Sequence, residues 1–109
     1  MNKFTDQISY EAELKTTSGE TIIVTAGPMS YDLLKRVDEE TDKLNKSIKN
    51  SPGKETLLTA ESNYLTFSMT FKVSLEDAHK FSPTLIMAVI RDYKDFLIKN
   101  AGAQSVLKK

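Results

Sequence analysis

The single histidine, His79, is the residue whose type could best support acid–base catalysis or metal binding. It lies beside Glu76, Asp77 and Lys80. A typical zinc site needs several His or Cys ligands, and the sequence has one His and no Cys. We therefore interpret His79 as a solvated side chain on a short helical turn. The sequence predicts no catalytic residue, no metal site and no cofactor.

Two other segments contain residue types that ligand-binding motifs use. The acidic run 38–40, with Asp42, lacks the glycine and the twelve-residue pattern of a calcium loop. Residues 51–56 lack the first glycine of a phosphate-binding loop and the Ser or Thr directly after its lysine. A Gly-x-Ser-x-Gly nucleophile motif is also absent. We interpret the acidic run as a solvated helix face and 51–56 as a plain turn.

The charge balance argues against a general affinity for nucleic acid or anionic lipid. Fifteen Lys and Arg residues balance fifteen Asp and Glu residues, so the chain has no net field to attract a polyanion. Nucleic-acid binding is the first alternative function, because four basic residues would share one helix. These residues are Arg36, Lys43, Lys46 and Lys49. Acidic residues interleave them, which disfavours nucleic acid as a partner.

Length and composition fit one soluble domain. A chain of 109 residues has room for one domain, and 39% hydrophobic with 28% charged residues is typical of a globular fold. The longest apolar run, 85–90, is too short to span a membrane, and no apolar leader follows the first residues. Together with the lack of cysteine, this predicts a cytoplasmic protein with no membrane partner. We place the domain at 1–102 and expect a frayed tail over 103–109.

The elements that must position these residues begin with a β-hairpin. Polar and apolar residues alternate over 7–15 and again over 21–26, which is typical of half-buried strands. Gly19, in the polar segment between them, can adopt the positive φ of a tight turn. The predicted inner faces are Ile8, Tyr10, Ala12 and Leu14 on the first strand and Ile22, Val24 and Ala26 on the second.

A charged helix is predicted after the hairpin. Ser30 is a suitable N-cap, and apolar residues recur at three- and four-residue steps until 50–54 ends the helix. The predicted apolar stripe is Tyr31, Leu34, Val37, Thr41, Leu44 and Ile48. Opposite charges four residues apart also predict ion pairs. These are Asp32 with Arg36, Lys35 with Glu39, Glu39 with Lys43, and Asp42 with Lys46.

Residues 56–73 fit two different structures. One set of apolar residues alternates with polar ones, as in a strand: Leu65, Phe67, Met69, Phe71 and Val73. Another set has the spacing of a helix: Leu57, Ala60, Tyr64, Phe67 and Phe71. We favour a strand over 64–73, because the alternation has no exception and β-forming residues are dense. A helix over 56–73 is the alternative.

The C-terminal part is predicted to be helical. Ser74 begins a short helical turn in a capping box. Ser82, with Pro83 after it, begins a longer helix, and 100–102 are expected to end it.

Together the elements predict an α+β fold in the order β-β-α-β-α. A right-handed crossover places the third strand beside the first, which gives a three-stranded antiparallel sheet of order 2-1-3. Two helices would pack on one face of this sheet. The other face has no aromatic residue in this register, which disfavours stacking of RNA bases.

Without a site for chemistry, the sequence favours a small non-enzymatic protein-binding module, such as an adaptor, an assembly chaperone or an inhibitor. Such a chain is also typical of accessory proteins of phages and mobile elements. The predicted partner is another protein, and open strand edges favour a homo-oligomer, in particular a homodimer. The candidate partner-binding residues are Met29, Tyr31, Tyr64, Val106 and Leu107. The second alternative is a small-molecule binder with a pocket between the sheet and the helices.

Overall fold

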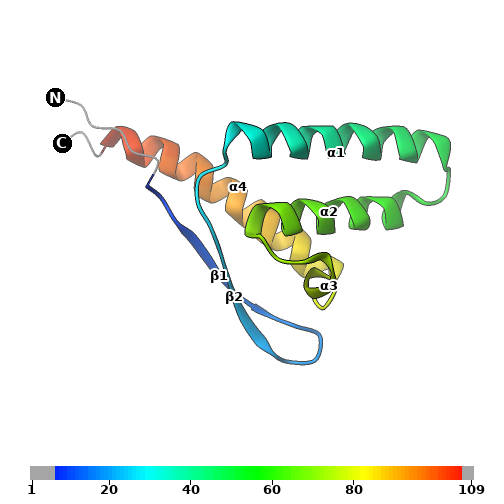
Figure 1. The fold of residues 1–109 in the computed structure, drawn as a ribbon, viewed down its shortest axis with the longest axis horizontal. Coiled ribbons are helices and arrows are strands. Elements are labelled where there is room, and N and C mark those ends of the chain that lie inside the picture. Colours follow the sequence, from blue (N-terminus) through cyan, green and yellow to red (C-terminus); the bar gives the residue numbers. More distant parts are fainter. Residues whose placement is uncertain (1–6, 107–109) are drawn as a thin grey trace.

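The computed structural model describes residues 7–106 of the chain. Its elements are, in order, β1 (Tyr10–Lys15), β2 (Thr21–Ala26), α1 (Tyr31–Asn50), α2 (Glu55–Phe71), α3 (Leu75–Ala78) and α4 (Pro83–Val106). Figure 1 shows two parts: an antiparallel pair formed by α1 and α2, and a β-hairpin that lies beside the long helix α4. The molecule is elongated and thin, with extents of 55 × 34 × 18 Å. A body this thin leaves one side of its outer helices in solvent.

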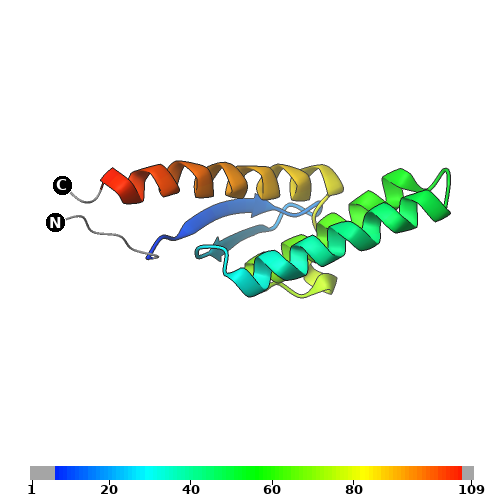
Figure 2. The ribbon, with the colours of Figure 1, turned by 90° about the horizontal axis from the view of Figure 1, so that it is seen from above.

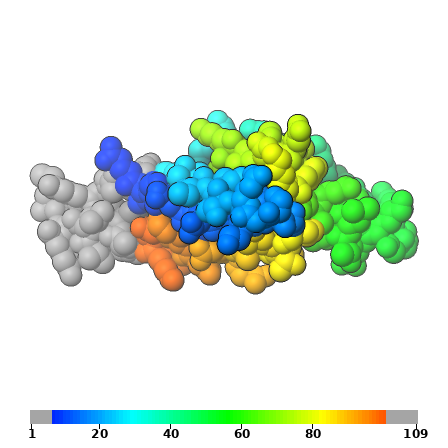
Figure 3. All heavy atoms as spheres, turned by 90° about the horizontal axis from the view of Figure 1, so that it is seen from below, coloured from blue at the N-terminus to red at the C-terminus, as the bar shows by residue number. Residues whose placement is uncertain are grey.

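The predicted β-hairpin is confirmed. β1 and β2 pair antiparallel, with Ala12 opposite Val24. The side chains of Tyr10, Leu14 and Val24 point inward and are buried, whereas Ile23 on the outer face is 66% exposed. In the space-filling view of Figure 3, the hairpin lies across the middle of one face, flanked by residues of α4 and α2.

The turn of the hairpin is fixed at both ends. Gly19 adopts a φ of +95°, and the Thr16 N–H donates to the Glu20 carbonyl oxygen at 2.8 Å. The Thr17 N–H and hydroxyl both donate to the carbonyl oxygen of Lys80, at 3.2 and 3.3 Å. The turn is therefore attached to the segment that joins α3 to α4.

The predicted third strand at 64–73 is wrong, because residues 55–71 form the helix α2. The buried residues of α2 are Tyr64, Phe67, Thr70 and Phe71, which recur at the three- and four-residue steps of one helix face. The alternative interpretation of this segment, a helix, is the one that the structure has.

The strand-like alternation arises because α2 is apolar on two opposite sides. Leu65 and Met69 line the side next to α1, whereas Phe67 and Phe71 lie in the core on the other side. Each pair is four residues apart, and the two pairs are offset by two residues. Two helical faces combined in this way reproduce a period of two, which normally indicates a strand.

The predicted arrangement of the sheet and the first helix needs correction too. The sheet of the described residues has two strands, so the order 2-1-3 is wrong. Among the described elements α1 packs on α2 alone, whereas α2 and α4 cover the inner face of the hairpin. Figure 2 shows the hairpin between α4 on one side and the α1–α2 pair on the other. The α+β class still describes this mostly helical fold.

An aromatic cluster joins the hairpin to the helices. The ring centroid of Tyr10 lies 5.9 Å from that of Phe71 and 5.4 Å from that of Tyr93. The rings of Phe71 and Tyr93 are 5.6 Å apart. All three side chains are buried. The cluster connects β1, α2 and α4, and such inclined ring pairs contribute about 0.5–1.5 kcal/mol each beyond the area they bury.

The predicted helix starts are confirmed by side-chain caps. The backbone N–H groups of Leu33, Asp77 and Leu85 donate to the hydroxyl oxygens of Ser30, Ser74 and Ser82 at 3.1, 3.1 and 3.2 Å. Each bond satisfies an N–H group that has no partner within its own helix.

The last helix continues past its predicted end at 100–102, as far as Val106. A glycine inside a helix costs about 1 kcal/mol, and Ala101 and Ala103 beside Gly102 are strong helix formers. Residues 103–106 of the predicted tail therefore belong to α4, and 107–109 lie outside the described residues. Within 7–106, no helix combines the length and the hydropathy that a membrane span requires.

Candidate functional site

The outer side of α1 is the candidate site, and we call it the α1 surface. It consists of the exposed residues Tyr31, Leu34, Lys35, Asp38, Thr41, Asp42, Asn45, Lys46 and Lys49. No residue of α1 is buried, and the side chains of Tyr31 and Leu34 are 75% and 53% exposed. Figure 1 shows α1 at an edge of the molecule, with α2 alongside.

The inner side of α1 forms a narrow seam with α2. The half-buried residues of α1 are Leu33, Val37, Glu40, Leu44, Ser47 and Ile48. Their steps of four and three are typical of two helices that pack side by side. The predicted stripe included Leu34 and Thr41, which are exposed; Leu33 takes part in the seam in place of Leu34.

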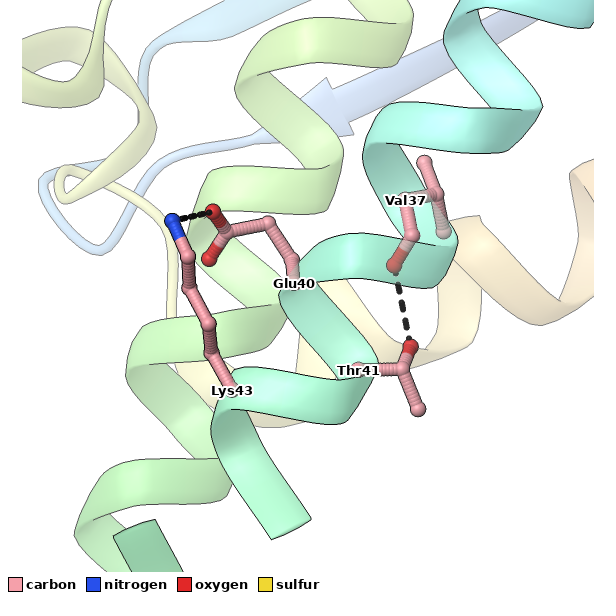
Figure 4. Close-up of polar contacts among 4 residues, drawn as sticks. All are labelled: Val37, Glu40, Thr41 and Lys43. Carbon is pink, nitrogen blue, oxygen red and sulfur yellow. Dashed lines mark hydrogen bonds and ion pairs between the residues drawn. The ribbon is translucent and has the colours of Figure 1, made fainter. Parts of the chain in front are cut away.

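Two polar contacts within α1 lie on different sides of the helix. The Lys43 Nζ lies 3.4 Å from the Glu40 Oε1, and the Thr41 hydroxyl donates to the Val37 carbonyl oxygen at 3.0 Å. Figure 4 shows Glu40 and Lys43 extending from one side of α1 and Thr41 from the other. Both Glu40 and Lys43 line a small groove of about 110 Å³ between α1 and α2, together with Leu44, Ser47, Leu58, Glu61, Ser62 and Leu65.

The charges of the α1 surface have no ion-pair partner among residues 7–100. None of the four ion pairs predicted along this helix is present there, and Lys43 pairs with Glu40 instead. Lys35, Asp38 and Asp42 therefore lie in solvent without an opposite charge in contact, as do Lys46 and Lys49.

The four basic residues considered for nucleic-acid binding lie on the same helix in different settings. Arg36 lines a cavity with Asp32 at the start of α1. Lys43 is paired with Glu40. Lys46 and Lys49 are exposed near the far end. Arg36 and Lys43 thus each have an acidic neighbour.

The structure places the five predicted partner-binding residues in different environments. Tyr31 is exposed on the α1 surface, and Met29 is half-buried against the core. Tyr64 is buried, and its hydroxyl donates to the Phe81 carbonyl oxygen at 2.6 Å. Burial raises the pKa of the Tyr64 phenol. Val106 is the last residue of α4, and its side chain, like Leu107, lies outside the described part of the chain.

His79 lies beside Tyr64 and next to an exposed ion pair. The centroids of the His79 and Tyr64 rings are 4.8 Å apart, and the two rings are nearly perpendicular. The neighbouring Lys80 Nζ lies 3.0 Å from the Asp77 Oδ1, and this hydrogen bond, with the charge of Lys80, lowers the pKa of the Asp77 carboxyl. Over the described residues, no group of three or more His, Cys, Asp or Glu side chains is placed to hold a metal ion.

Several cavities border the helices. One, of about 360 Å³, lies between α2 and the start of α4 and is lined by Glu55, Thr56, Thr59, Ala60, Asn63, Pro83, Thr84 and Met87. Another, of about 380 Å³, lies where β2 leads into α1 and is lined by Gly27, Pro28, Ser30, Asp32, Leu33, Arg36, Met69, Thr70, Lys72 and Tyr93. A third cavity, of about 300 Å³, lies between β1 and α4, where the predicted small-molecule pocket was expected, and is lined by Tyr10, Glu11, Asp92, Asp95, Phe96 and Lys99.

Several exposed apolar residues were not among the predicted partner-binding residues. They are Ile23, Leu34, Leu57, Leu75, Met87 and Ile98. The alternation of β2 already placed Ile23 on the outer face. Leu34 gave no such signal, because Leu33 and Leu34 are adjacent and the pattern does not show which of them faces α2.

Comparison with protein-family models, with curated proteins and with solved structures finds no match for this chain. The functional argument therefore depends on the geometry of the chain itself.

Proposed function

We propose that the protein is a non-enzymatic protein-binding module of the adaptor, assembly-chaperone or inhibitor type, and that it binds its partner through the α1 surface. The observation that carries the proposal is the incomplete packing of α1. This helix of 20 residues has no buried residue and leaves Tyr31 and Leu34 largely exposed. Most helices in proteins owe their stability to packing of an apolar face, so a partner on the open side would stabilise α1.

The composition of the α1 surface supports a protein as the partner. An aromatic side chain beside an aliphatic one, surrounded by charged groups, is typical of a protein interface with an apolar centre and a polar rim. Tyr31 and Leu34 lie three residues apart and so are neighbours on the helix.

The experiment that tests this proposal replaces Leu34 with a photo-crosslinking phenylalanine derivative in the full chain, in the cells that naturally make it. Thr25, exposed on the outer face of the hairpin, receives the same replacement as a control. We expect a covalent adduct with one defined protein at Leu34 and none at Thr25. Equal labelling at the two positions would count against the α1 surface.

A second measurement uses the partner identified in this way, in purified form. Leu34→Asp is expected to weaken its binding at least tenfold, because the substitution places a charge in an apolar contact. Ile23→Asp is the matched control, since Ile23 is also an exposed aliphatic residue, at 66% against 53% for Leu34. If both variants bind as tightly as the wild type, the proposal is wrong.

A further inference from the structure

Charge is segregated along α1. Residues 31–42 contain five acidic and two basic residues, which gives this half a net charge of −3. Residues 43–50 contain Lys43, Lys46 and Lys49 and no acidic residue, which gives a net charge of +3. The Glu40–Lys43 pair neutralises one charge in each half. The two halves of the helix therefore keep net charges of −2 and +2. On the α1 surface itself, Lys35, Asp38 and Asp42 give one half a net charge of −1, and Lys46 and Lys49 give the other half +2. No described residue of the chain neutralises these charges in an ion pair.

This distribution is complementary to itself only in the antiparallel direction. A helix of 20 residues with a rise of 1.5 Å is about 30 Å long, so its halves are about 15 Å long. When two copies are related by a twofold axis across the middle of α1, the acidic half of each faces the basic half of the other. A parallel pair would place like charges together along its whole length, which is unfavourable.

Apolar side chains at the ends of α1 fit the same arrangement. Tyr31 and Leu34 are exposed in the acidic half, and Ile48 is half-buried in the basic half. With 100° per residue, Leu34 and Ile48 lie within about 40° of each other around the helix. Ile48 also belongs to the seam with α2, so an antiparallel pair would bring Leu34 of one copy against the part of Ile48 that stays exposed in the second copy, at each end.

We propose that α1 of one copy pairs antiparallel with α1 of a second copy, so that the partner of the α1 surface is the protein itself, in a twofold dimer. This inference rests on the proposed protein-binding function and names its partner. Exposed charges interact less strongly as salt is added, with a Debye length of about 10 Å at 0.1 M and about 3 Å at 1 M. The dimer is therefore weaker at high salt.

The first test measures self-association of the full chain by sedimentation equilibrium at 50 and 500 mM NaCl. We expect a dimer whose Kd rises at least tenfold at the higher salt concentration. A monomer at 100 µM protein and 50 mM NaCl would overturn the inference.

Charge reversal then tests the pairing itself. Lys46→Glu with Lys49→Glu makes both halves of the α1 surface net negative, although Lys35 remains, and Asp38→Lys with Asp42→Lys makes both halves positive. Each double variant alone is expected to be at least tenfold weaker in self-association, whereas an equimolar mixture of the two forms a heterodimer. Charges placed near helix ends also affect the stability of the helix itself, but helix stability does not explain recovery in the mixture.

A matched control reverses the charge of two lysines on another helix, α4. Lys94→Glu with Lys99→Glu alters the net charge as much as the α1 double lysine variant, at exposed positions of α4. We expect this control to dimerise like the wild type. Circular dichroism of every variant confirms that it folds. If the α4 variant loses the dimer and the α1 variants keep it, the interface lies elsewhere and the inference is wrong.

Engineered disulfides test the direction of pairing, because the chain contains no cysteine. Thr41→Cys lies near the middle of α1, so two copies can cross-link under oxidation. Tyr31→Cys lies about 14 Å from the middle, so two copies would lie about 28 Å apart, too far for a disulfide, whose Cα atoms are within about 7 Å. Cross-linking at both positions would indicate parallel pairing and would overturn the inference.

The two proposals fail in different ways. If the chain is monomeric but photo-crosslinking at Leu34 captures another protein, the dimer is ruled out and the binding function stands. If the chain is monomeric and no adduct forms at Leu34, both are wrong.

Discussion

The hydroxyl of Tyr93, in α4, donates a hydrogen bond of 2.7 Å to the carbonyl oxygen of Gly27, which lies between β2 and α1. Tyr93 is buried and also contacts the rings of Tyr10 and Phe71. This bond ties the segment that leads into α1 to the core. Together with the seam between α1 and α2, the bond helps to hold the α1 surface in place relative to the rest of the molecule.

Tyr93→Phe should destabilise the protein by about 1–2 kcal/mol, because it leaves the Gly27 carbonyl oxygen without this donor. For a chain of this size, that corresponds to a fall in Tm of roughly 4–16 °C. Urea unfolding followed by circular dichroism measures the change. Tyr31→Phe is the matched control: Tyr31 is 75% exposed, so the same substitution there should change the free energy of unfolding by less than about 0.5 kcal/mol. Equal effects at both positions would contradict the role of the Tyr93 bond.

Stability should fall at alkaline pH. Burial raises the pKa of the phenols of Tyr10, Tyr64 and Tyr93 above the ordinary value of 10.0, and for Tyr10 the hydrogen bond to Asp92 and the charge of Asp92 raise it further. The folded chain thus holds these protons more tightly than the unfolded chain. Their contribution is complete below pH 10 and is lost as the pH rises above it. Each phenol contributes a slope of up to about 1.4 kcal/mol per pH unit.

Unfolding by urea at pH 9, 10 and 11 measures this dependence. The free energy of unfolding should fall between pH 10 and pH 11, and Tyr10→Phe should make the fall shallower. A slope that is the same in Tyr10→Phe as in the wild type would show that Tyr10 ionises equally easily in the folded and unfolded chains.

The sequence predicted the hairpin well because each of its strands has one apolar face. Tyr10, Leu14 and Val24 are all buried and lie in strands where inward- and outward-facing residues alternate. The period of two in the hairpin therefore arises from a single buried face. In α2 the same period arises from two helical faces, one against α1 and one in the core. The pattern of a single segment does not show how many neighbours cover it, and this information came only from the tertiary structure.

The candidate site was predictable in part. Ser30 correctly indicated where α1 begins, and Tyr31 was selected beside it and is exposed. Tyr64 was selected for its place near the end of a supposed strand, and the structure instead buries it within a helix. The open side of α1 was not predictable, because the apolar stripe was expected to pack on a three-stranded sheet that does not form.

Thr70→Val should stabilise the protein by about 1 kcal/mol. Thr70 is 7% exposed, and among the described atoms its hydroxyl oxygen has no hydrogen-bond partner. Valine has nearly the same shape without the buried hydroxyl, so it removes the cost of taking that group out of water. Chemical unfolding measures the gain, with Thr56→Val at an exposed position of α2 as the control. Destabilisation by Thr70→Val would show that the hydroxyl is hydrogen-bonded in solution.

Lys72→Gly should also stabilise the protein, by about 0.5–1 kcal/mol. Lys72 ends α2 with a φ of 57° and a ψ of 41°, and its N–H donates to the Ser68 carbonyl oxygen. A side chain at this left-handed position costs about 1–2 kcal/mol, which glycine avoids, although part of the gain is offset by the greater freedom of glycine in the unfolded chain. Lys72→Ala is the control, because it removes the charge but keeps the Cβ atom. The thermal unfolding midpoint should rise for Lys72→Gly and not for Lys72→Ala; an equal rise in both would assign the effect to the charge of Lys72 and not to its backbone conformation.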